Sequence, residues 1–310
     1  MRCVVTGASG FVGRRLLLRL ADHGHGGIAT GRTPPAHLPM GWTGASRSDL
    51  LRDAAQDCDV VIHLEVKQHV LRPTAADIEA FEAVNVAGTR DWLDWAARNG
   101  VQRFVLVSSI KAASPDGPYG ASKARAEAAL REWSAAAAAR QATILRPAPI
   151  YGPGNAANFA AFVRQVIAGR PCLVGSGTTR KSVVSVGNVA AAIEFVACHE
   201  APGCAVFTVT DPATLSLREL AALIATLAGS PPPRSIPRIL AQCAAPLGDI
   251  ITAITGREMP LTTARLRALD EESVFSADAL VATGFRHPQT TREGIAELVD
   301  AALRGPTVRS

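Results

Sequence analysis

The sequence predicts an α/β fold: a doubly wound parallel sheet followed by a smaller C-terminal α/β domain. Short runs rich in Val, Ile and Leu alternate with helical patterns through the first half of the chain. This alternation is typical of parallel strands that are buried on both faces and connected by helices. A glycine-rich turn joins the first apolar run to the first helical pattern. After Arg146-Pro147 the composition shifts toward Gly and Pro, so we expect the first domain to cover residues 1–150.

The elements of the first domain follow in chain order. Strands are expected at 2–6, at 28–30 with its end at Gly31-Arg32, at 59–64 and at 104–108, and helices at 11–23, 79–99 and 121–139. The alanine-rich run from Trp133 to Arg140 is expected to continue the last helix, because Ala has the highest helix propensity.

Residues 151–310 are expected to form mainly the second domain. Its helical patterns lie at 216–228, 236–254 and 262–269, and a tail follows from residue 276. A segment near 183–209 is expected to join the first domain. The last residues, Gly305 to Ser310, are expected to fray.

Composition argues against several function classes. The 310 residues carry a net charge of +5, but the basic residues are scattered, so no nucleic-acid partner is expected. The six cysteines form no Cys-x-x-Cys pair and the histidines do not cluster, which argues against a metal site or disulfides and favours a cytoplasmic location. No apolar run reaches the ~18 residues of a membrane span, and the N-terminus leads directly into a strand rather than a signal peptide.

The stretch Thr6–Gly13 indicates a dinucleotide site with Gly-x-x-Gly-x-x-Gly spacing. Glycines between a strand and a helix let the backbone approach a pyrophosphate, and the helix directs its N–H groups and positive dipole end toward the phosphates. The alternative is a purely structural tight turn. The turn residues expected to bind the cofactor are Gly7, Ser9, Gly10, Phe11, Val12 and Gly13.

Tyr119-Gly120-Ala121-Ser122-Lys123 is the second informative motif. Positions i and i+4 share one face of a helix, so Tyr119 and Lys123 are expected to point into one cleft. A nearby ammonium group lowers a tyrosine pKa from about 10 toward neutral, which would make Tyr119 a usable acid or base. The alternative is a solvent-exposed helix pair without a catalytic role.

Three further polar residues have either a functional or a structural role. Ser109 follows the strand at 104–108, where ligands bind in open α/β sheets, and its hydroxyl can hydrogen-bond a carbonyl substrate. Ser108 is expected only to cap the following segment. Asn85 falls within a helical pattern and is expected to be either a local hydrogen-bonding residue or a functional one.

Taken together, these motifs resemble the extended short-chain dehydrogenase/reductases, in the nucleotide-sugar epimerase/dehydratase group with its Rossmann-like sheet. The matching pieces are Thr6–Gly13, Asp59–Leu64, Val84–Thr89, Val107-Ser108-Ser109, Tyr119–Lys123, Arg146-Pro147 through Gly154, Thr283-Gly284-Phe285, Pro288 and Glu293-Gly294. Within that group, Lys67–Leu71 leading to Phe81, Ser108–Lys111 and Asn158-Phe159 look like the branch that reduces UDP-4-keto-6-deoxy-hexosamines, which is related to UDP-glucose 4-epimerases.

The resemblance implies hydride transfer at C4 of a nucleotide-linked sugar. By position, Ser109 would hold the sugar oxygen, Tyr119 would be the acid/base, and Lys123 would bind the nicotinamide ribose. The other residues placed by the resemblance are Asp49, Leu50, Leu64, Asn85 and Pro147 toward the cofactor, and Lys111, Asn158, Arg180 and Lys181 toward the substrate. Arg180 and Lys181 are equally compatible with a solvated loop. Ile110-Lys111 replaces the Asp-Glu pair of the dehydratases, which disfavours dehydration.

Arg32 bears on the choice of cofactor. An acidic residue at the end of the second strand would suit the ribose hydroxyls of NAD, whereas an arginine can pair with a 2′-phosphate. Arg32 therefore favours NADP, with NAD as the alternative.

Three functions remain open: reduction of a nucleotide-linked 4-keto sugar, nucleotide-sugar 4-epimerisation, and a non-catalytic dinucleotide sensor or scaffold. The last is suggested by the short connection from Ser109 to Tyr119 and by Glu65, which stands where the family usually has a small residue. A homodimer built on the helices near 79–99 and 121–139 is implied by the resemblance. Trp92, Leu93 and Trp95 are expected either to serve that interface or to lie in the core.

Overall fold

The computed structural model describes residues 1–33, 35, 37–52, 57–68, 70, 73–155, 158–199, 203–255, 259 and 261–304. These residues form two compact units. The first unit comprises Met1–Ile150, Val186–Thr210 and Ser276–Pro288, and the second comprises Tyr151–Ser185, Asp211–Phe275 and Gln289–Ser310. Ser276–Pro288, grouped with the second domain in the sequence analysis, thus belongs to the first unit.

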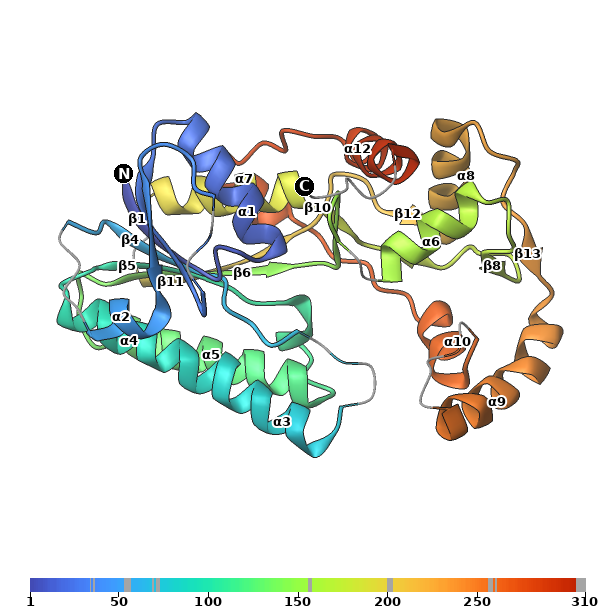
Figure 1. The fold of residues 1–310 in the computed structure, drawn as a ribbon, viewed down its shortest axis with the longest axis horizontal. Helices are drawn as coiled ribbons and strands as arrows, with labels where there is room; N and C mark the ends of the chain where they lie inside the picture. Colours follow the sequence, from blue (N-terminus) through green and yellow to red (C-terminus); the bar gives the residue numbers. More distant parts are fainter. Residues whose placement is uncertain are drawn as a thin grey trace. The chain divides into compact units, whose positions relative to one another are not determined.

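A seven-stranded parallel sheet forms the centre of the first unit (Figure 1). Its strands are β1 (Arg2–Thr6), β2 (Gly26–Gly31), β3 (Trp42–Ser46), β4 (Val60–His63), β5 (Arg103–Val107), β6 (Gln141–Pro147) and β11 (Gly203–Val209). The spatial order is β11-β6-β5-β4-β1-β2-β3. The order therefore reverses between β1 and β4, where ligands bind in doubly wound sheets. The predicted α/β class with a Rossmann-like sheet is confirmed.

Helices cover both faces of this sheet (Figure 1). α1 (Phe11–Asp22) and α7 (Val186–Cys198) pack together on one face, and α4 (Gly88–Arg98) and α5 (Pro118–Ala135) pack together on the other. The short helices α2 (Arg47–Arg52) and α11 (Asp278–Val281) complete the unit.

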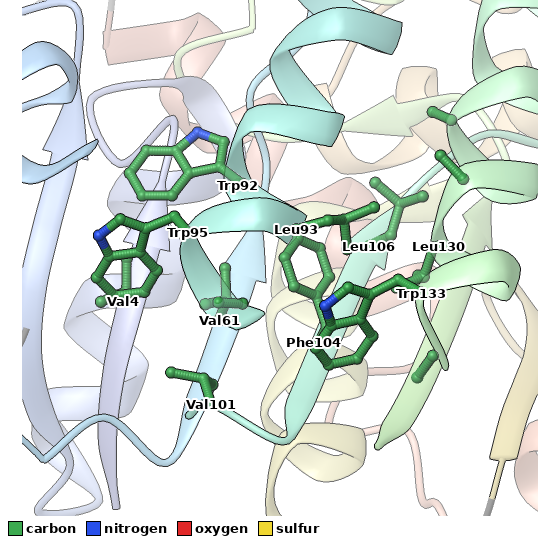
Figure 2. Close-up of a cluster of buried hydrophobic side chains, with 14 of the residues drawn as sticks. Val4, Val61, Trp92, Leu93, Trp95, Val101, Phe104, Leu106, Leu130 and Trp133 are labelled. Atoms are coloured by element: carbon green, nitrogen blue, oxygen red, sulfur yellow. The ribbon is translucent and has the colours of Figure 1, made fainter. Parts of the chain in front are cut away.

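The core beneath α4 and α5 is rich in aromatic residues (Figure 2). Trp92 and Trp95 are both 0% exposed and meet edge to face at 5.7 Å between ring centroids. Leu93 is 3% exposed, and Phe104 and Trp133 extend the same cluster. Of the two alternatives for Trp92, Leu93 and Trp95, the core is correct, because side chains buried within one chain have no surface to offer a second copy.

The helix expected at 79–99 is interrupted. α3 (Ala75–Phe81) is preceded by its N-cap residue Thr74, whose side chain forms a capping box with Asp77. A π-helical segment, η1 (Glu82–Ala87), then continues directly into α4. A π segment holds one residue more per turn and is frequent at functional sites.

The alanine-rich run does not continue α5 to Arg140 as expected, because α5 ends at Ala135. Arg140 donates to the carbonyl of Trp133 at 2.9 Å, lies over its ring at 4.7 Å, and accepts from Ser134 at its own carbonyl. These contacts fix a turn into β6, which starts at Gln141. Capping and strand pairing thus prevail over the helix propensity of alanine.

The second unit is built from helices and two-stranded sheets. Its helices are α6 (Asn158–Ile167), α8 (Leu217–Ala228), α9 (Arg238–Thr255), α10 (Thr263–Asp270) and α12 (Thr291–Arg304). The paired strands are β7 (Ile150–Tyr151) with β10 (Val184–Ser185), β9 (Arg180–Lys181) with β12 (Leu215–Ser216), and β8 (Leu173–Val174) with β13 (Ser235–Ile236). Tyr151, Ile224 and Ile295 lie in the core between α6, α8 and α12. Tyr151 donates to Asp211 at 2.5 Å.

All six cysteines are free thiols. In the part of the chain that the structure describes, no three His, Cys, Asp or Glu side chains are grouped in a way suited to a metal ion. Among the same residues, no helix combines the length and apolarity needed to cross a bilayer.

Candidate active site

The glycine turn lies at the carboxyl end of β1. Gly7 has φ +63°, and a Cβ there would lie 2.9 Å from the backbone nitrogen of Glu65 and the carbonyl carbon of Leu64. Only glycine therefore permits the turn to fold this closely against the end of β4. Gly10 is the N-cap residue of α1, and no side chain caps that helix end. These residues fit a dinucleotide pyrophosphate, because the amides of the first turn of α1 are the donors that such a group requires.

The residues expected near the adenosine follow β2 and β3. Arg32 is exposed directly after β2. Asp49 and Leu50 lie in α2, where the Asp49 carboxylate accepts from Ser46 at 2.5 Å and Leu50 is buried. Ser9 is exposed in the turn, and its carbonyl accepts from Arg14.

Glu65 is held by groups on two other elements. Its carboxylate accepts from the Arg47 guanidinium at 3.2 Å and from the Trp92 indole at 3.0 Å. Arg47 also pairs with Asp91 at 2.6 Å. Glu65 therefore belongs to an ion-pair network that joins α2 to α4.

Tyr119 and Lys123 lie one turn apart on α5. Pro118 occupies the first helical position, which its fixed φ favours. Lys123 is 1% exposed and donates through Nζ to the carbonyl of Val107, at the end of β5, at 2.9 Å. Burial lowers the pKa of Lys123 to about 8, although the Glu127 carboxylate raises it in part. The pair is thus not a solvent-exposed helix pair.

The prediction that the Lys123 ammonium group lowers the pKa of Tyr119 is wrong. Burial raises the pKa of Tyr119 above its ordinary value, and a hydrogen bond with Ser109 only partly offsets this. Lys123 directs its ammonium group at the Val107 carbonyl instead. Tyr119 is therefore a protonated phenol at neutral pH, and Ser109 is its side-chain partner.

The capping role expected of Ser108 belongs to Ser109 instead. Ser109 is the N-cap of the 3₁₀ turn η2 (Ile110–Ala112), accepting from the Lys111 amide at 3.3 Å. Ser108 does not cap this turn and instead donates to the buried carboxylate of Glu127 at 2.7 Å. The reason is the alternation of a strand: consecutive side chains point to opposite sides, and Ser108 faces α5.

The short connection between Ser109 and Tyr119 depends on Gly120. A Cβ at Gly120 would lie 2.6 Å from the Lys111 carbonyl and 3.1 Å from Cα of Pro115. The loop therefore packs directly on the first turn of α5, with the Lys111 side chain exposed. This close packing keeps Ser109 and Tyr119 within hydrogen-bonding reach despite the shortened loop.

Sequence reasoning missed Glu127, which is 1% exposed. It lies one turn beyond Lys123 and forms a two-point ion pair with Arg146, at 2.8 and 2.6 Å. Burial alone would raise the pKa of Glu127. Hydrogen bonds from Arg146 and Ser108, together with the charges of Arg146 and Arg131, have the larger effect, so the pKa of Glu127 lies below its ordinary value. The detectable signal was its spacing: Tyr119, Lys123 and Glu127 follow one another at four-residue intervals.

Asn85 is fully buried in η1 and makes long-range rather than local side-chain hydrogen bonds. Its Oδ1 accepts from the Lys67 amide at 2.8 Å, and its Nδ2 donates to Ser122 at 2.9 Å and to the Lys67 carbonyl. It therefore joins the segment after β4 to α5. In that segment, His69 and Leu71 lie outside the described residues.

His63 was also missed. Its Nδ1 lies 2.8 Å from the Thr6 hydroxyl and its Nε2 lies 3.1 Å from the Thr89 hydroxyl. Thr89 donates to the Asn85 carbonyl, so its oxygen accepts from the ring. Burial, with the charges of Lys123 and Arg47, lowers the pKa of His63 to about 3. A neutral imidazole on β4 thus connects the end of β1 with α4.

The remaining predicted residues fall in two groups. Leu64 and Pro147 lie at the carboxyl ends of β4 and β6, at the same edge of the sheet as Ser109. Asn158, Arg180 and Lys181 belong to the second unit. Asn158 is the first residue of α6, while Arg180 donates to the Thr214 carbonyl and Lys181 to the carbonyls of Ala268 and Glu271. Lys181 thus holds the C-terminal end of α10.

Comparison with known proteins places this geometry in a family. A profile of the NAD dependent epimerase/dehydratase family matches residues 3–207. The chain belongs to this family. It is an enzyme of the extended short-chain dehydrogenase/reductase type, as the motifs implied.

Two curated members of the family align over most of the chain. N-acetyl-alpha-D-glucosaminyl-diphospho-ditrans,octacis-undecaprenol 4-epimerase of Escherichia coli O157:H7 is 29% identical, over 94% of this chain and 92% of its own length. UDP-glucose 4-epimerase of Vibrio cholerae is 31% identical, over 79% of this chain and 77% of its own length. A solved structure, MoeE5 in complex with UDP-glucose and NAD, has the same fold, with a TM-score of 0.72 and 22% identity over 98% of this chain and 99% of that chain.

Proposed function

We propose that this enzyme is a 4-epimerase that oxidises and re-reduces C4 of a diphosphate-linked sugar. The observation that carries the proposal is the placement of Tyr119 and Lys123 one turn apart on α5, with Ser109 hydrogen-bonded to Tyr119 beyond β5. The two relatives described above, which align over 94% and 79% of this chain, are named for 4-epimerisation, and this supports the proposed reaction. One relative is named for a sugar carried by undecaprenyl diphosphate, so the proposal includes lipid-linked as well as nucleotide-linked sugars.

In this mechanism Tyr119 exchanges a proton with the C4 oxygen, and Ser109 orients that oxygen by a hydrogen bond. Lys123 would bind the cofactor ribose, and its ammonium group is held by the Val107 carbonyl one helical turn from Tyr119. A bound nicotinamide dinucleotide would accept the C4 hydrogen as hydride and return it to the other face of the sugar. Because Tyr119 is protonated at rest, the reductive half-reaction can start directly, whereas the oxidative half-reaction first requires loss of the phenolic proton.

A second candidate is the NADP-dependent reduction of a nucleotide-linked 4-keto sugar, which Arg32 favours. Its exposed guanidinium follows β2, where a 2′-phosphate would be recognised. A cytoplasmic homodimer also remains a prediction. The substrate-facing roles of Lys111, Asn158, Arg180 and Lys181 also remain predictions.

The two candidates are distinguished by their use of the cofactor. We would incubate the purified enzyme with UDP-N-acetylglucosamine or undecaprenyl-diphosphate-linked N-acetylglucosamine, and separate the C4 epimers by chromatography. Epimer formation without net cofactor consumption, abolished in Tyr119→Phe, is expected. Stoichiometric NADPH oxidation with a UDP-4-keto-6-deoxy sugar, and no epimer, would instead establish the reductase. Cofactor binding without turnover of any of these substrates would contradict both.

A further inference from the structure

Five polar side chains of the first unit are connected by hydrogen bonds although each is at most 1% exposed. They come from β1, β4, η1, α4 and α5, and they are Thr6, His63, Asn85, Thr89 and Ser122. We call these five residues the buried polar chain. Its first member precedes the glycine turn, and its last member lies on α5 beside Tyr119. Polar groups at this depth are stable only when each has a partner, so the partners define how the chain is ordered.

The Thr6 hydroxyl sets the position of the proton on the His63 ring. Its oxygen accepts from the backbone amides of Leu64 and Glu65, at 3.1 and 3.3 Å. A hydroxyl oxygen accepts two hydrogen bonds and donates one, so the proton of Thr6 is directed at Nδ1 of His63, 2.8 Å away. Nδ1 therefore accepts, and the neutral ring carries its own proton on Nε2.

The hydrogen bonds on the other side of the ring require the same tautomer. Nε2 donates to the Thr89 hydroxyl at 3.1 Å, and that hydroxyl donates to the Asn85 carbonyl at 2.7 Å. A ring protonated on Nδ1 would direct its N–H at a hydroxyl that already accepts twice, and would leave the Thr89 oxygen without a donor. The two threonines thus fix both the orientation and the tautomer of the His63 ring.

The chain reaches α5 through the side chain of Asn85. Its Nδ2 donates to the Ser122 hydroxyl at 2.9 Å, and that hydroxyl donates to the backbone carbonyl of Tyr119 at 2.8 Å. The turn of α5 that carries Tyr119 is therefore connected, bond by bond, to the residue that precedes the glycine turn. A buried network in which every member has a partner is rigid, because any movement leaves a polar group unpaired.

We propose that His63 is a positioning residue, which fixes the glycine turn and the Tyr119 turn of α5 relative to one another through Thr89 and Asn85. The proposal rests on the proposed function in one respect: it takes the glycine turn as the cofactor site and Tyr119 as the acid/base. Hydride transfer and proton transfer then start from these two places, and a displacement of about 1 Å between reacting groups costs about 100-fold in rate. His63 acts on the reaction through its hydroxyl partners.

Substitutions of Thr89 test the positioning role by kinetics. Thr89→Val removes the hydroxyl between His63 and Asn85 and should lower kcat by about 10- to 100-fold. It leaves the bond between Thr6 and His63 intact, so the Kd for the cofactor, measured by isothermal titration, should change less than about threefold. Thr89→Ser retains the hydroxyl and should restore kcat to within about threefold of wild type. The control is Thr143→Val, a buried threonine near the start of β6, which should not change kcat.

Two further measurements need no substrate. In ¹⁵N NMR of histidine-labelled wild type, the His63 signals, assigned by their loss in His63→Gln, should show a neutral ring protonated on Nε2. Amide hydrogen exchange then reports on α5. The amides of Ser122 and Lys123 should exchange about tenfold faster in Thr89→Val than in wild type, because the turn has lost one of its fixed connections. Exchange in Thr89→Ser and Thr143→Val should match wild type.

Several results would overturn the proposal. One is a His63 ring protonated on Nδ1 in wild type, and another is equal loss of kcat in Thr89→Val and Thr89→Ser. A third is a Thr89→Val enzyme whose kcat equals that of wild type, or whose loss appears in the cofactor Kd instead. Circular dichroism checks that Thr89→Val folds. If it does not, His63→Gln, whose amide lies near the Nε2 position, should retain at least about tenfold more activity than His63→Leu.

Failure of the positioning role and failure of the proposed function give different results. If wild type epimerises none of the sugars, the proposed reaction is removed, while the ring tautomer and the exchange rates at Ser122 and Lys123 still decide whether the chain holds α5. If wild type epimerises its substrate and Thr89→Val does so at the same rate, the reaction is retained and the positioning role is removed.

Discussion

Glu127 and Arg146 form a partly buried two-point ion pair, with Nε and Nη2 of the arginine 2.8 and 2.6 Å from the two carboxylate oxygens. The pair joins α5 to β6 directly behind Lys123, whose pKa the Glu127 carboxylate raises in part. The same carboxylate accepts from Ser108. One buried acid thus fixes the helix that carries Tyr119 relative to the strand that precedes Ser109.

Glu127→Gln should lower the free energy of unfolding by about 3 kcal/mol at pH 7, because the charge of Arg146 loses its partner. The folded-state pKa of Glu127 lies below its unfolded value, so the stabilisation is present above the unfolded pKa and disappears as the pH falls through the folded one. The difference from wild type should accordingly shrink below about pH 4. Urea titrations measure it, with the exposed Glu132→Gln on the same helix as the control.

Lys123→Met should stabilise the fold while abolishing turnover. The folded-state pKa of about 8 lies below that of an ordinary lysine, so the buried charge destabilises the folded state at pH 7 and this cost disappears as the pH rises from 8 toward 10.5. Allowing for the lost hydrogen bond to Val107, the variant should gain about 2 kcal/mol at pH 7. The gain should vanish near pH 10. A variant that is less stable than wild type at pH 7 would contradict this account.

Gly120→Ala tests the packing of the short loop on α5. The added methyl would lie 2.6 Å from the Lys111 carbonyl and must move the loop that carries Ser109. We expect kcat to fall between about tenfold and a hundredfold, because small displacements of reacting groups are costly. Gly117→Ala, three residues earlier, has no atom within 4 Å of the new Cβ and should change kcat less than twofold. Equal losses in both variants would show that the loop position does not matter.

Arg32→Ser should change cofactor preference rather than affinity in general. If the guanidinium pairs with a 2′-phosphate, its loss should raise the Kd for NADP by about 10- to 100-fold. The Kd for NAD should change little, and it serves as the internal control. Isothermal titration with both cofactors measures the ratio. An unchanged ratio would remove Arg32 from the specificity argument and leave NAD as the simpler choice.

The sequence was informative where local chemistry and tertiary structure agree. The glycine turn, the strand at 104–108 and the Tyr119–Lys123 spacing each encode one local geometry, and the structure has them in place. β6 was missed because its apolar run is followed by Arg146-Pro147, which resembles a boundary. β3 was missed because Trp42–Ser46 holds one large apolar residue and is paired only with β2.

The parts of the site that could not be predicted depend on contacts between distant segments. The partner of Ser108 is 19 residues away on another element, and the Thr6 hydroxyl contacts His63 across 57 residues. The pKa of Tyr119 was misjudged for the same reason: helical spacing shows that a lysine is near, but not that a carbonyl from β5 holds its ammonium group. Burial, which sets the direction of the shift, is a property of the assembled fold.

The π-helical segment Glu82–Ala87 also affects how this chain should be compared with its relatives. One residue inserted into an α-helix produces such a segment, and each residue turns the helix by about 100°. Deleting one residue there would rotate α3, with Thr74 and Phe81, by about 100° relative to α4, which carries Thr89 and Trp92. A relative with a regular helix must therefore be aligned with a one-position gap inside 82–87. An ungapped alignment would assign the role of Asn85 to a neighbouring position.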